Sequence, residues 1–528
     1  MKRRTVLKSA LAGTAALAAP HVVGAQSAAK LINFVPHADL ASLDPMWTTA
    51  DVTRNYSLAI FDTLYGYDAQ FNVQPQMLAG DKVENDGKTW ELTLREGLKF
   101  HDGEKVLAKD CVATIKRFVK RDPFGQALMK RVDEIAATSD TTIRIRLNKP
   151  FPLLRNALAQ VYCAMMPERL AALDPFTQQI PEAIGSGPFK FLKDERIPGS
   201  RVVFARNEAY VPRTGGVPSF NAGPKVVNVD RVIWNFIPDP GTISAALQQG
   251  EVDWWENPTI DLIPQMKKNN KLWIGVKDRT GEIACLRFNH LHPPFDNPAI
   301  RRIVLAAMDQ QEIMQVVAGA EPSLIKIDVG IFVPDTPLAS KVGVEQTRGP
   351  KDYEKLKKDL IAAGYKGEKI VVLAATTIPI IWAEAQVSAD VLKRIGFNVD
   401  FQALEWGSVV QRRASKEPND KGGWNIFYTY LGGFGNVSPA PNIAIRGNGA
   451  ATWFGWPTNP KMEALYDSWF EAPDLASQRK IVDDMQAVFW QDPPYAPMGM
   501  FDQPTAYHTY LSDVRDGWPQ FYGLKKNI

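Results

Sequence analysis

The chain has 528 residues, of which 45% are hydrophobic and 23% are charged. This composition is typical of globular proteins, and it excludes a disordered, fibrous or collagen-like chain. Because a single hydrophobic core stops growing at about 250 to 300 residues, the length predicts two to four domains.

The formal net charge of +3 is concentrated at the start of the chain, where Lys2, Arg3, Arg4 and Lys8 supply four of the 61 basic residues. The other 57 basic residues are balanced by 58 acidic residues. Nucleic-acid binding depends on a clustered excess of cations, so this balance argues against a nucleic acid as the partner.

Residues 1–25 are typical of an export signal, with a basic start, a weakly apolar stretch and the small residue Ala25 at the expected cleavage site. The run from Arg3 to Lys8 resembles a twin-arginine signal. We therefore predict export by that route, cleavage after Ala25 and a periplasmic mature protein, with general secretion as the alternative route. A membrane anchor is not expected, because the apolar stretch is much shorter than the roughly 20 residues that span a bilayer.

The first part of the mature chain mixes strand and helix patterns. Alternating or apolar runs predict strands over 30–35, 89–94 and 142–147, and helical spacing predicts helices over 51–62, 108–120 and 152–159. Between residues 185 and 254 the pattern changes to short strands, with one helix over 242–249 that Gly250 closes as a left-handed cap.

The pattern beyond Cys285 changes again. One long helix is expected over 297–319, and helices are expected over 353–363, 460–470 and 477–490. A strand over 369–374, a helix over 380–395 and a strand over 397–401 make a βαβ unit. The chain is therefore predicted to have an α/β fold.

The three cysteines, Cys111, Cys163 and Cys285, are an odd number for an exported protein, so at most one disulfide could form. Their spacing matches no zinc or redox motif, and their neighbours are apolar. We expect buried structural thiols and no cofactor.

Enzyme motifs are missing from the sequence: it contains no G-x-S-x-G, H-E-x-x-H, Walker A or complete G-x-G-x-x-G pattern. We predict that the protein is not an enzyme, and a secreted hydrolase is a remote alternative. His290 and His292 would share one side of a strand and could hold a metal ion, although a third ligand is not apparent; the other reading is that they brace a loop.

Aromatic residues gather in the segment 424–434, a predicted strand that ends in a Gly-rich loop. Pockets combine aromatic surface with a few polar groups, so this segment is either a binding wall or part of the core. The candidate ligand-binding residues are Tyr428, Tyr430, Gly432 and Phe434 from the segment, Trp47 and Trp406 as opposing walls, and Thr49, Asp51, Asn436 and Arg446 for polar contacts.

Several segments occur together in a characteristic order after the export signal. They are Leu43-Asp44-Pro45, Asp86 to Trp90 running on to Arg95 to Gly103, Gly185 to Phe189, Arg206 to Tyr210, Leu247 to Asp253, and Phe288-Asn289 through Pro294-Phe295-Asp296 to Arg301. Together they closely resemble family 5 solute-binding proteins of ABC importers, the peptide and nickel type, over nearly all of the mature chain.

The resemblance implies a type II periplasmic-binding-protein fold with two lobes, an extra subdomain and the ligand cleft between the lobes. It implies the following division: 1–25 signal peptide, 26–66 first segment of lobe 1, 67–184 extra subdomain, 185–284 second segment of lobe 1, 285–494 lobe 2 and 495–528 final segment of lobe 1. It also implies a monomeric receptor that delivers a small solute or short peptide to membrane permease subunits. A metal or metal-chelate receptor is the alternative.

One loop departs from the family pattern. In peptide-binding relatives this loop carries an Asp that holds the α-ammonium group of the peptide, whereas residues 431–438 here contain no acid. A buried cation without a countercharge costs several kcal/mol, so free-amine peptides are expected to bind poorly unless another carboxylate substitutes. Asp51 is the candidate substitute, and its alternative role is an N-cap for the helix that follows.

Overall fold

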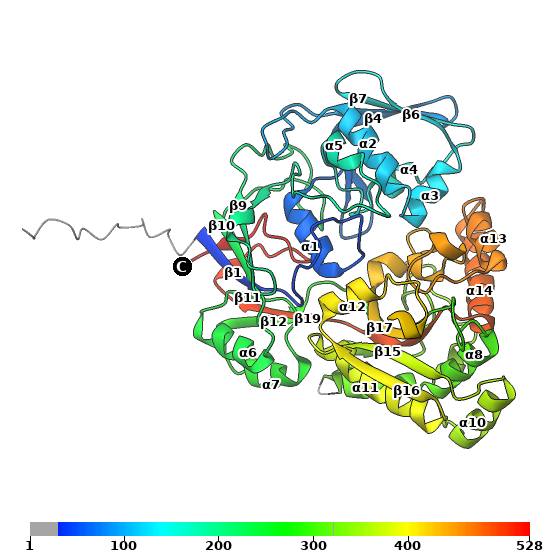
Figure 1. Ribbon diagram of the computed structural model, residues 1–528. Helices are drawn as coiled ribbons and strands as arrows, with labels where there is room; N and C mark the ends of the chain where they lie inside the picture. Colours follow the sequence, from blue (N-terminus) through cyan, green and yellow to red (C-terminus); the bar gives the residue numbers. More distant parts are fainter. Residues whose placement is uncertain (1–29, 320) are drawn as a thin grey trace, which may run out of the picture.

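The computed structural model describes residues 30–319 and 321–528, and it forms two lobes that face each other (Figure 1). The predicted export signal and the cleavage after Ala25 lie outside the described residues. Within those residues, no helix has both the length and the apolar character to cross a membrane.

The first lobe is built on a mostly antiparallel sheet of seven strands, in the order β12-β19-β11-β1-β10-β9-β8. Its central strand β1 pairs in parallel with both β10 and β11. The strands are β1 (Leu31–Val35), β8 (Phe189–Phe191), β9 (Arg201–Arg206), β10 (Arg231–Asn235), β11 (Trp254–Trp255), β12 (Leu272–Val276) and β19 (Pro504–His508), and the helices of this lobe are α1 (Asp51–Ile60), α6 (Pro240–Gln249) and α7 (Ile263–Met266).

A four-stranded antiparallel sheet, in the order β4-β5-β7-β6, lies at one end of this lobe, at the top of Figure 1. Its elements are β4 (Leu78–Glu84), β5 (Thr89–Leu94), α2 (Ala108–Phe118), α3 (Pro123–Met129), β6 (Val132–Ala137), β7 (Thr142–Leu147), α4 (Leu154–Leu158) and α5 (Glu168–Ala171). Small two-stranded sheets are formed by β2 (Tyr65–Tyr67) with β3 (Val73–Pro75), and by β20 (Leu511–Ser512) with β21 (Lys525–Lys526).

The second lobe is built on a six-stranded mixed sheet, in the order β14-β18-β13-β17-β15-β16. Its strands are β13 (Glu282–Phe288), β14 (Ile325–Lys326), β15 (Lys369–Ala375), β16 (Asn398–Leu404), β17 (Ile426–Gly432) and β18 (Tyr495–Phe501). Its helices are α8 (Pro298–Ala307), α9 (Gln310–Ala318), α10 (Tyr353–Ala362), α11 (Pro379–Arg394), α12 (Trp406–Arg412), α13 (Pro460–Trp469) and α14 (Leu475–Gln491).

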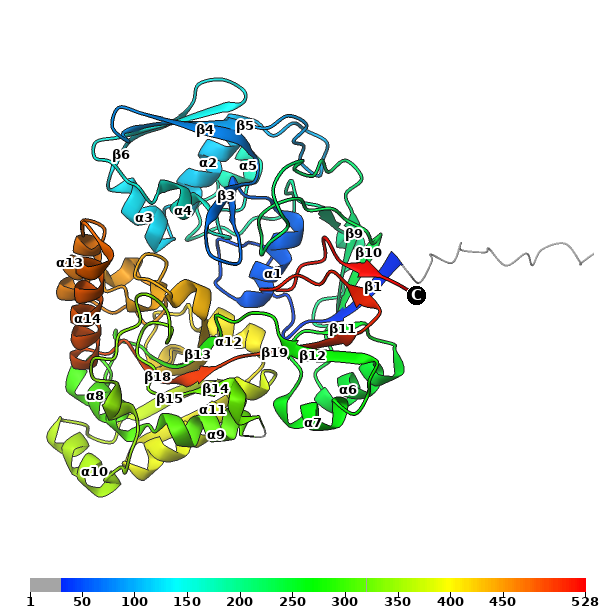
Figure 2. The ribbon, with the colours of Figure 1, turned by 180° about the vertical axis from the view of Figure 1, so that it is seen from behind.

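Two short connections join the large sheets. The chain leaves the seven-stranded sheet after β12 and enters the six-stranded sheet at β13, and it returns between β18 and β19 (Figure 2). The domain boundaries given above stay a prediction. Two short crossings leave the lobes free to pivot about one region, which is the geometry of a hinge.

Several predicted elements are confirmed. The βαβ unit consists of β15, α11 and β16, with the two strands parallel and paired from Lys369↔Asn398 to Ala375↔Leu404. Helix α6 ends at Gly250, whose φ of 83° is the left-handed cap expected there. Cys111, Cys163 and Cys285 are all buried and free, as expected for structural thiols.

The prediction of one helix over 297–319 is wrong. Met308 adopts an extended backbone, and the chain restarts as α9 with Asp309 as its N-cap. The Asp309 carboxylate accepts hydrogen bonds from the backbone N–H groups of Gln311 at 2.8 Å and Glu312 at 3.1 Å. The helical spacing of apolar residues continues through the break, so periodicity alone did not reveal the cap.

Candidate ligand-binding cavity

A cavity of about 580 Å³ lies between the two lobes. Its walls come from the loop before α1, from the region of α2 and α3, from α12 and from the loop that follows β17. A cavity of this size suits a small organic molecule, and its position between lobes means that a ligand would touch both of them.

Eight of the ten predicted site residues line this cavity. They are Trp47, Thr49, Asp51, Trp406, Tyr430, Gly432, Phe434 and Asn436. Two of them also reach partners across the cavity: the Thr49 hydroxyl accepts a hydrogen bond from the Trp453 indole N–H at 3.2 Å, and Phe434 contacts rings of the first lobe. The structure therefore brings most of the predicted residues together, and their contact with a ligand stays a prediction.

The prediction that Tyr428 lines the cleft is wrong. Side chains alternate along a strand, and in β17 the Phe427 and Thr429 side chains face the Arg413 side of the sheet and the cavity. Tyr428 lies on the opposite face, where α11 packs, and it is fully buried. Tyr430 shares that face but sits near the end of the strand, where it reaches the cavity.

The prediction that Arg446 makes polar contacts in the cleft is also wrong. Its guanidinium donates to both carboxylate oxygens of Glu463, at 2.9 and 2.6 Å. It also lies 3.8 Å from the centre of the Tyr466 ring. Arg446 is buried by these contacts and is absent from the cavity wall, so its role is to hold the segment before α13.

Asp51 lines the cavity but is not the N-cap of α1. Ala50 occupies the N-cap position, and Asp51 is the first residue of the helix. Its carboxylate accepts a hydrogen bond from the Arg54 guanidinium, one turn further on, at 2.7 Å. The negative charge that was expected to replace the missing loop acid is therefore already balanced by a neighbouring cation.

A small chamber of about 50 Å³ adjoins the main cavity and shares His37, Asp51, Arg54, Tyr430 and Trp518 with it. Its other charged residues are Glu256, Lys277, Asp278 and Glu282. Burial, together with the charge of Asp51, raises the pKa of Glu282 well above its usual range. The Glu282 oxygen Oε2 is buried and has no hydrogen-bond partner among residues 30–319 and 321–528.

His37 and Glu256 form a buried pair in this chamber. The Nδ1 atom of His37 lies 2.8 Å from a Glu256 carboxylate oxygen, whose partner oxygen accepts from Asn55 at 2.6 Å. Burial alone would lower the pKa of His37, but the Glu256 carboxylate raises it above its ordinary value. The Glu256 carboxylate therefore favours the protonated form of His37, and the pair holds the end of the adjoining strand in place.

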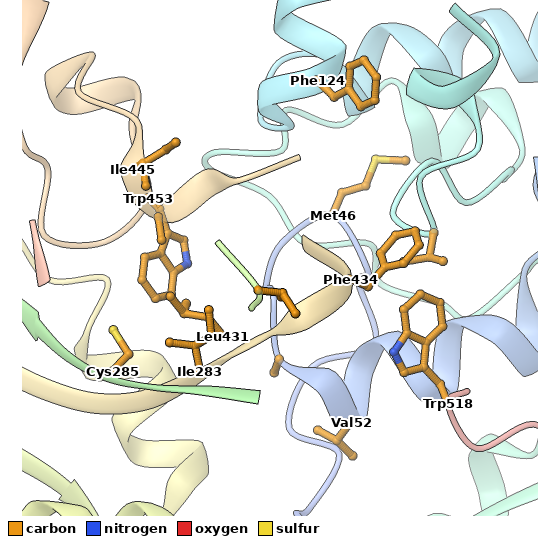
Figure 3. Packing of buried hydrophobic residues seen from close by; sticks show 14 of the residues in the cluster. Met46, Val52, Phe124, Ile283, Cys285, Leu431, Phe434, Ile445, Trp453 and Trp518 are labelled. Atoms are coloured by element: carbon orange, nitrogen blue, oxygen red, sulfur yellow. The ribbon is translucent and has the colours of Figure 1, made fainter. Parts of the chain in front are cut away.

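Phe434 packs into an aromatic cluster, which consists of Phe434 and four rings of the first lobe. Its ring centre lies 5.1 Å from Tyr67, 5.6 Å from Phe71, 5.9 Å from Phe220 and 5.0 Å from Trp518. Figure 3 shows Phe434 between Met46 and Trp518. The ring borders the cavity, but most of its surface is buried against the opposite lobe.

Two members of the aromatic cluster have strained backbones. Phe71 and Phe220 adopt the left-handed region, with φ of 62° and 48°. This conformation costs a bulky residue on the order of 1 to 3 kcal/mol. The first lobe therefore holds these two rings in place around Phe434 at an energetic cost.

The two histidines considered as metal ligands do not have the expected geometry. His290 and His292 follow β13 in a turn rather than a strand, and neither lines the cavity. The His292 Nε2 atom lies 2.9 Å from the backbone oxygen of Lys416. Within the residues that the structure describes, no three His, Cys, Asp or Glu side chains gather as a metal site.

Four basic side chains that border the cavity, Arg54, Arg121, Arg413 and Lys416, are not among the predicted site residues. Arg121 lies over the Trp47 ring at 5.7 Å, and Lys416 over the Trp456 ring at 5.4 Å. The basic residues at 412 and 413 are adjacent in the sequence, so the pattern could not show that only Arg413 faces inwards.

Comparison with known proteins agrees with this geometry. Residues 72–453 match the model for bacterial extracellular solute-binding proteins, family 5. The chain is 37% identical over 522 residues to a probable peptide ABC transporter periplasmic-binding protein, y4tO, of Sinorhizobium fredii, and the match covers 97% of each chain. The chain belongs to this family of solute-binding proteins.

Solved structures of two-lobed binding proteins share the fold of this chain. The binding protein AgaA of A. tumefaciens, in complex with agropinic acid, has a TM-score of 0.78 at 20% identity, covering 94% of this chain and 99% of its own. DppA of Helicobacter pylori, in complex with the peptide STSA, has a TM-score of 0.76 at 19% identity, covering 94% and 98%. The predicted family, the two-lobed α/β fold and the function as a solute-binding transport protein are confirmed.

Proposed function

We propose that the mature chain is a periplasmic receptor that captures one organic solute between its lobes and delivers it to the permease of an ABC importer. The observation that carries this proposal is the cavity of about 580 Å³ lined by both lobes. The name of the S. fredii relative supports the link to an ABC transporter. The receptor needs no catalysis of its own, and we expect it to act as a monomer.

We infer that the ligand contacts the eight predicted residues that border the cavity. Tyr430 and Trp406 offer aromatic surface, and Thr49 and Asn436 offer polar groups. The Asn436 oxygen Oδ1 is buried without a hydrogen-bond partner in the described part of the chain, so it is available to a donor on the ligand. A peptide-like, opine-like, sugar or aromatic solute could use this combination.

Free-amine peptides are the less favoured ligands. The loop after β17 carries no acid, and Asp51 is already paired with Arg54. Replacing Asn436 by Asp would restore an acid to that loop. A gain in affinity for free-amine dipeptides would support this account, whereas tight dipeptide binding by the unaltered protein would overturn it.

We also propose that the precursor is exported by the twin-arginine route. The proposal depends on the run from Arg3 to Lys8 and on the expected cleavage after Ala25. Replacing Arg3 and Arg4 together by Lys should retain the precursor in the cytoplasm. Normal export of that variant would instead indicate general secretion.

The receptor function is tested by a thermal-shift screen of the purified mature protein against a metabolite library. A ligand present at 100 times its dissociation constant adds about 2.7 kcal/mol to the free energy of unfolding, which gives a clear rise in melting temperature. Mass spectrometry of ligand released from the native protein provides a second route to the same molecule. If no organic compound binds in either experiment, the receptor proposal fails.

A further inference from the structure

Arg413, at the end of α12, is a buried cation that forms no ion pair with any described residue. Its side chain borders the cavity, and the residue is only 1% exposed. The single hydrogen bond of its guanidinium is a long one, 3.5 Å from Nη2 to the Thr48 hydroxyl, and the buried Nε atom has no acceptor among the described residues. No acidic side chain in residues 30–319 and 321–528 forms an ion pair with it.

Other buried arginines in the described chain make more and shorter hydrogen bonds than Arg413 does. Arg117 donates to both oxygens of Asp44, at 3.0 and 2.8 Å, deep in the first lobe. Arg446 makes the same two-pronged contact with Glu463, and Arg287 donates to two backbone oxygens. Folded proteins pair buried charges in this way because an unpaired buried charge lowers the free energy of unfolding. The Arg413 guanidinium, which has no anionic partner among the described residues, is therefore unusual.

Aromatic rings surround the Arg413 guanidinium and keep it dry. Its central carbon lies 4.7 Å from the ring centre of Phe454, 5.4 Å from Trp406, 5.6 Å from Phe427 and 5.8 Å from Trp453. Cation–π attraction offsets part of the cost of burial. Even so, burial lowers the pKa of Arg413 to about 9, because the rings replace only part of the lost hydration.

The nearby charges do not supply the missing anion. Asp51 is the acid whose charge acts on the pKa of Arg413, but its carboxylate already forms an ion pair with Arg54. Arg121 and Lys416 are further cations on the cavity wall, and neither forms an ion pair with a described residue. Asp122 caps α3 through the Gly125 N–H, and burial raises the pKa of its carboxyl to about 7. The wall around Arg413 is therefore electropositive.

We infer that the ligand of this receptor is an organic carboxylate whose carboxylate group binds the Arg413 guanidinium, with the Thr48 hydroxyl beside it. The inference rests on the proposed receptor function and names the chemical class of its solute. The planar guanidinium presents two parallel donors that match the two oxygens of a carboxylate. A phosphate group, with three oxygens and up to two charges, would need more donors than this ring-lined pocket presents.

The test uses the mature protein and matched probes. Aromatic carboxylic acids and N-acylated amino acids are each compared with their own primary amides, and with phosphate monoesters that lack a carboxylate. We expect only the acids to raise the melting temperature. In Arg413→Met the dissociation constant of the best acid should increase by at least about 30-fold, because the ion pair is lost while the apolar stem is kept.

The neighbouring residue provides the matched control. Arg412 does not border the cavity, and its guanidinium donates to the backbone oxygens of Gly422 and Gly423. Arg412→Met removes the same charge from the same helix end, so it should lower the melting temperature but leave the affinity for the acid within about threefold. Arg413→Met without ligand should melt no lower than the wild type, because it removes an unpaired buried charge.

The outcomes separate the two proposals. If an amide or a phosphate monoester binds as tightly as the acid, or if Arg413→Met binds the acid within threefold of wild type, the carboxylate inference is overturned and the receptor function stands. If no compound binds at all, the receptor proposal fails, and the unliganded melting temperatures still decide the role of Arg413. An Arg413→Met protein that melts below both wild type and Arg412→Met would show that the guanidinium stabilises the fold instead.

Discussion

Tyr428 and Tyr430 are two residues apart and chemically identical, yet they have different surroundings. Tyr428 is fully buried between β17 and α11, whereas Tyr430 is partly exposed to the cavity. Tyr428→Ala should lower the free energy of unfolding by about 3 to 5 kcal/mol, the range for large aromatic truncations in a core. Denaturant unfolding of the variant measures this loss.

Tyr430→Ala should affect binding more than folding. Truncating an aromatic side chain at a binding hot spot typically costs about 2 kcal/mol or more, so the dissociation constant should rise at least tenfold. Calorimetric titration with the ligand from the screen measures it. If Tyr430→Ala melts much earlier than wild type and the folded fraction binds normally, then its ring belongs to the core.

The sequence could predict which types of residue form the site, but not which of two neighbours faces it. Trp406 and the aromatic segment were predicted from their Gly-rich loop context, and Trp47 from the family resemblance; Trp406, Trp47, Tyr430 and Phe434 line the cavity. Arg413 was missed beside Arg412, and Tyr428 was wrongly included beside Thr429. Those choices depend on the exact end of α12 and on the face of β17 that α11 covers, and both are set by contacts between distant segments.

At the scale of elements, helix α11 carries a buried acid in its packed face. Glu384 is fully buried, and neither carboxylate oxygen has a hydrogen-bond partner among the described residues. Burial raises its pKa well above the ordinary value of 4.5 for a glutamate. The folded protein therefore keeps this proton at a pH where the unfolded chain has lost it.

Glu384 should make the protein less stable as the pH rises. Between the unfolded pKa near 4.5 and the higher folded pKa, the folded state binds more protons, so the free energy of unfolding falls with increasing pH. Glu384→Gln cannot ionise, so its stability should match wild type near pH 4 and exceed it by more than about 1 kcal/mol at pH 8. Urea unfolding at both pH values measures the difference.

The control for this experiment is Glu417→Gln, which changes an exposed carboxylate in a loop. That variant should keep the pH dependence of the wild type. If Glu384→Gln also keeps it, the carboxyl of Glu384 does not carry the proton in the folded state, and the explanation from burial is wrong.

The break between α8 and α9 provides a second test at this scale. Asp309→Ala removes the acceptor of two backbone N–H groups at the start of α9, and it should cost about 1 kcal/mol of stability. Asp309→Asn retains an acceptor oxygen and should lose less than half as much. Equal losses in the two variants, measured by urea unfolding, would mean that charge rather than hydrogen bonding sets the cap energy.

Regular elements were predictable where local signals agree with each other. The βαβ unit over β15, α11 and β16 combines apolar strands, helical spacing and terminal glycines, and it forms as expected. The helix predicted over 297–319 was too long, because the helical spacing of apolar residues continues past Asp309, which caps a second helix. A cap is a single residue, and its effect depends on the backbone of Met308 that precedes it.

For the whole molecule, the order of family segments predicted two lobes, and structural neighbours of known fold confirm this arrangement. The contacts that close the lobes were not predictable. They join Phe434, from the loop after β17, to Tyr67, Phe71, Phe220 and Trp518, which come from three separate parts of the chain. No local pattern specifies a cluster assembled over such distances in the sequence.

This aromatic cluster should help to hold the lobes closed. Phe434 belongs to the second lobe and the other four rings to the first, so the contact exists only when the lobes are together. Burying a Phe side chain contributes about 1.5 to 3 kcal/mol. Phe434→Ala should therefore shift the equilibrium towards open forms by roughly 10-fold to 100-fold.

Small-angle scattering measures this shift as the radius of gyration. Without ligand, Phe434→Ala should have a larger radius than wild type, and saturating ligand should reduce the radius of both, because a ligand that touches both lobes favours the closed state. The dissociation constant of the variant should rise as its closed population falls. The control is Phe401→Ala, which removes a ring packed 5.6 Å from Trp382 inside the second lobe, and it should leave the radius unchanged. Equal radii for Phe434→Ala and wild type, both free and saturated with ligand, would show that the aromatic cluster forms when the lobes close but does not stabilise the closed state.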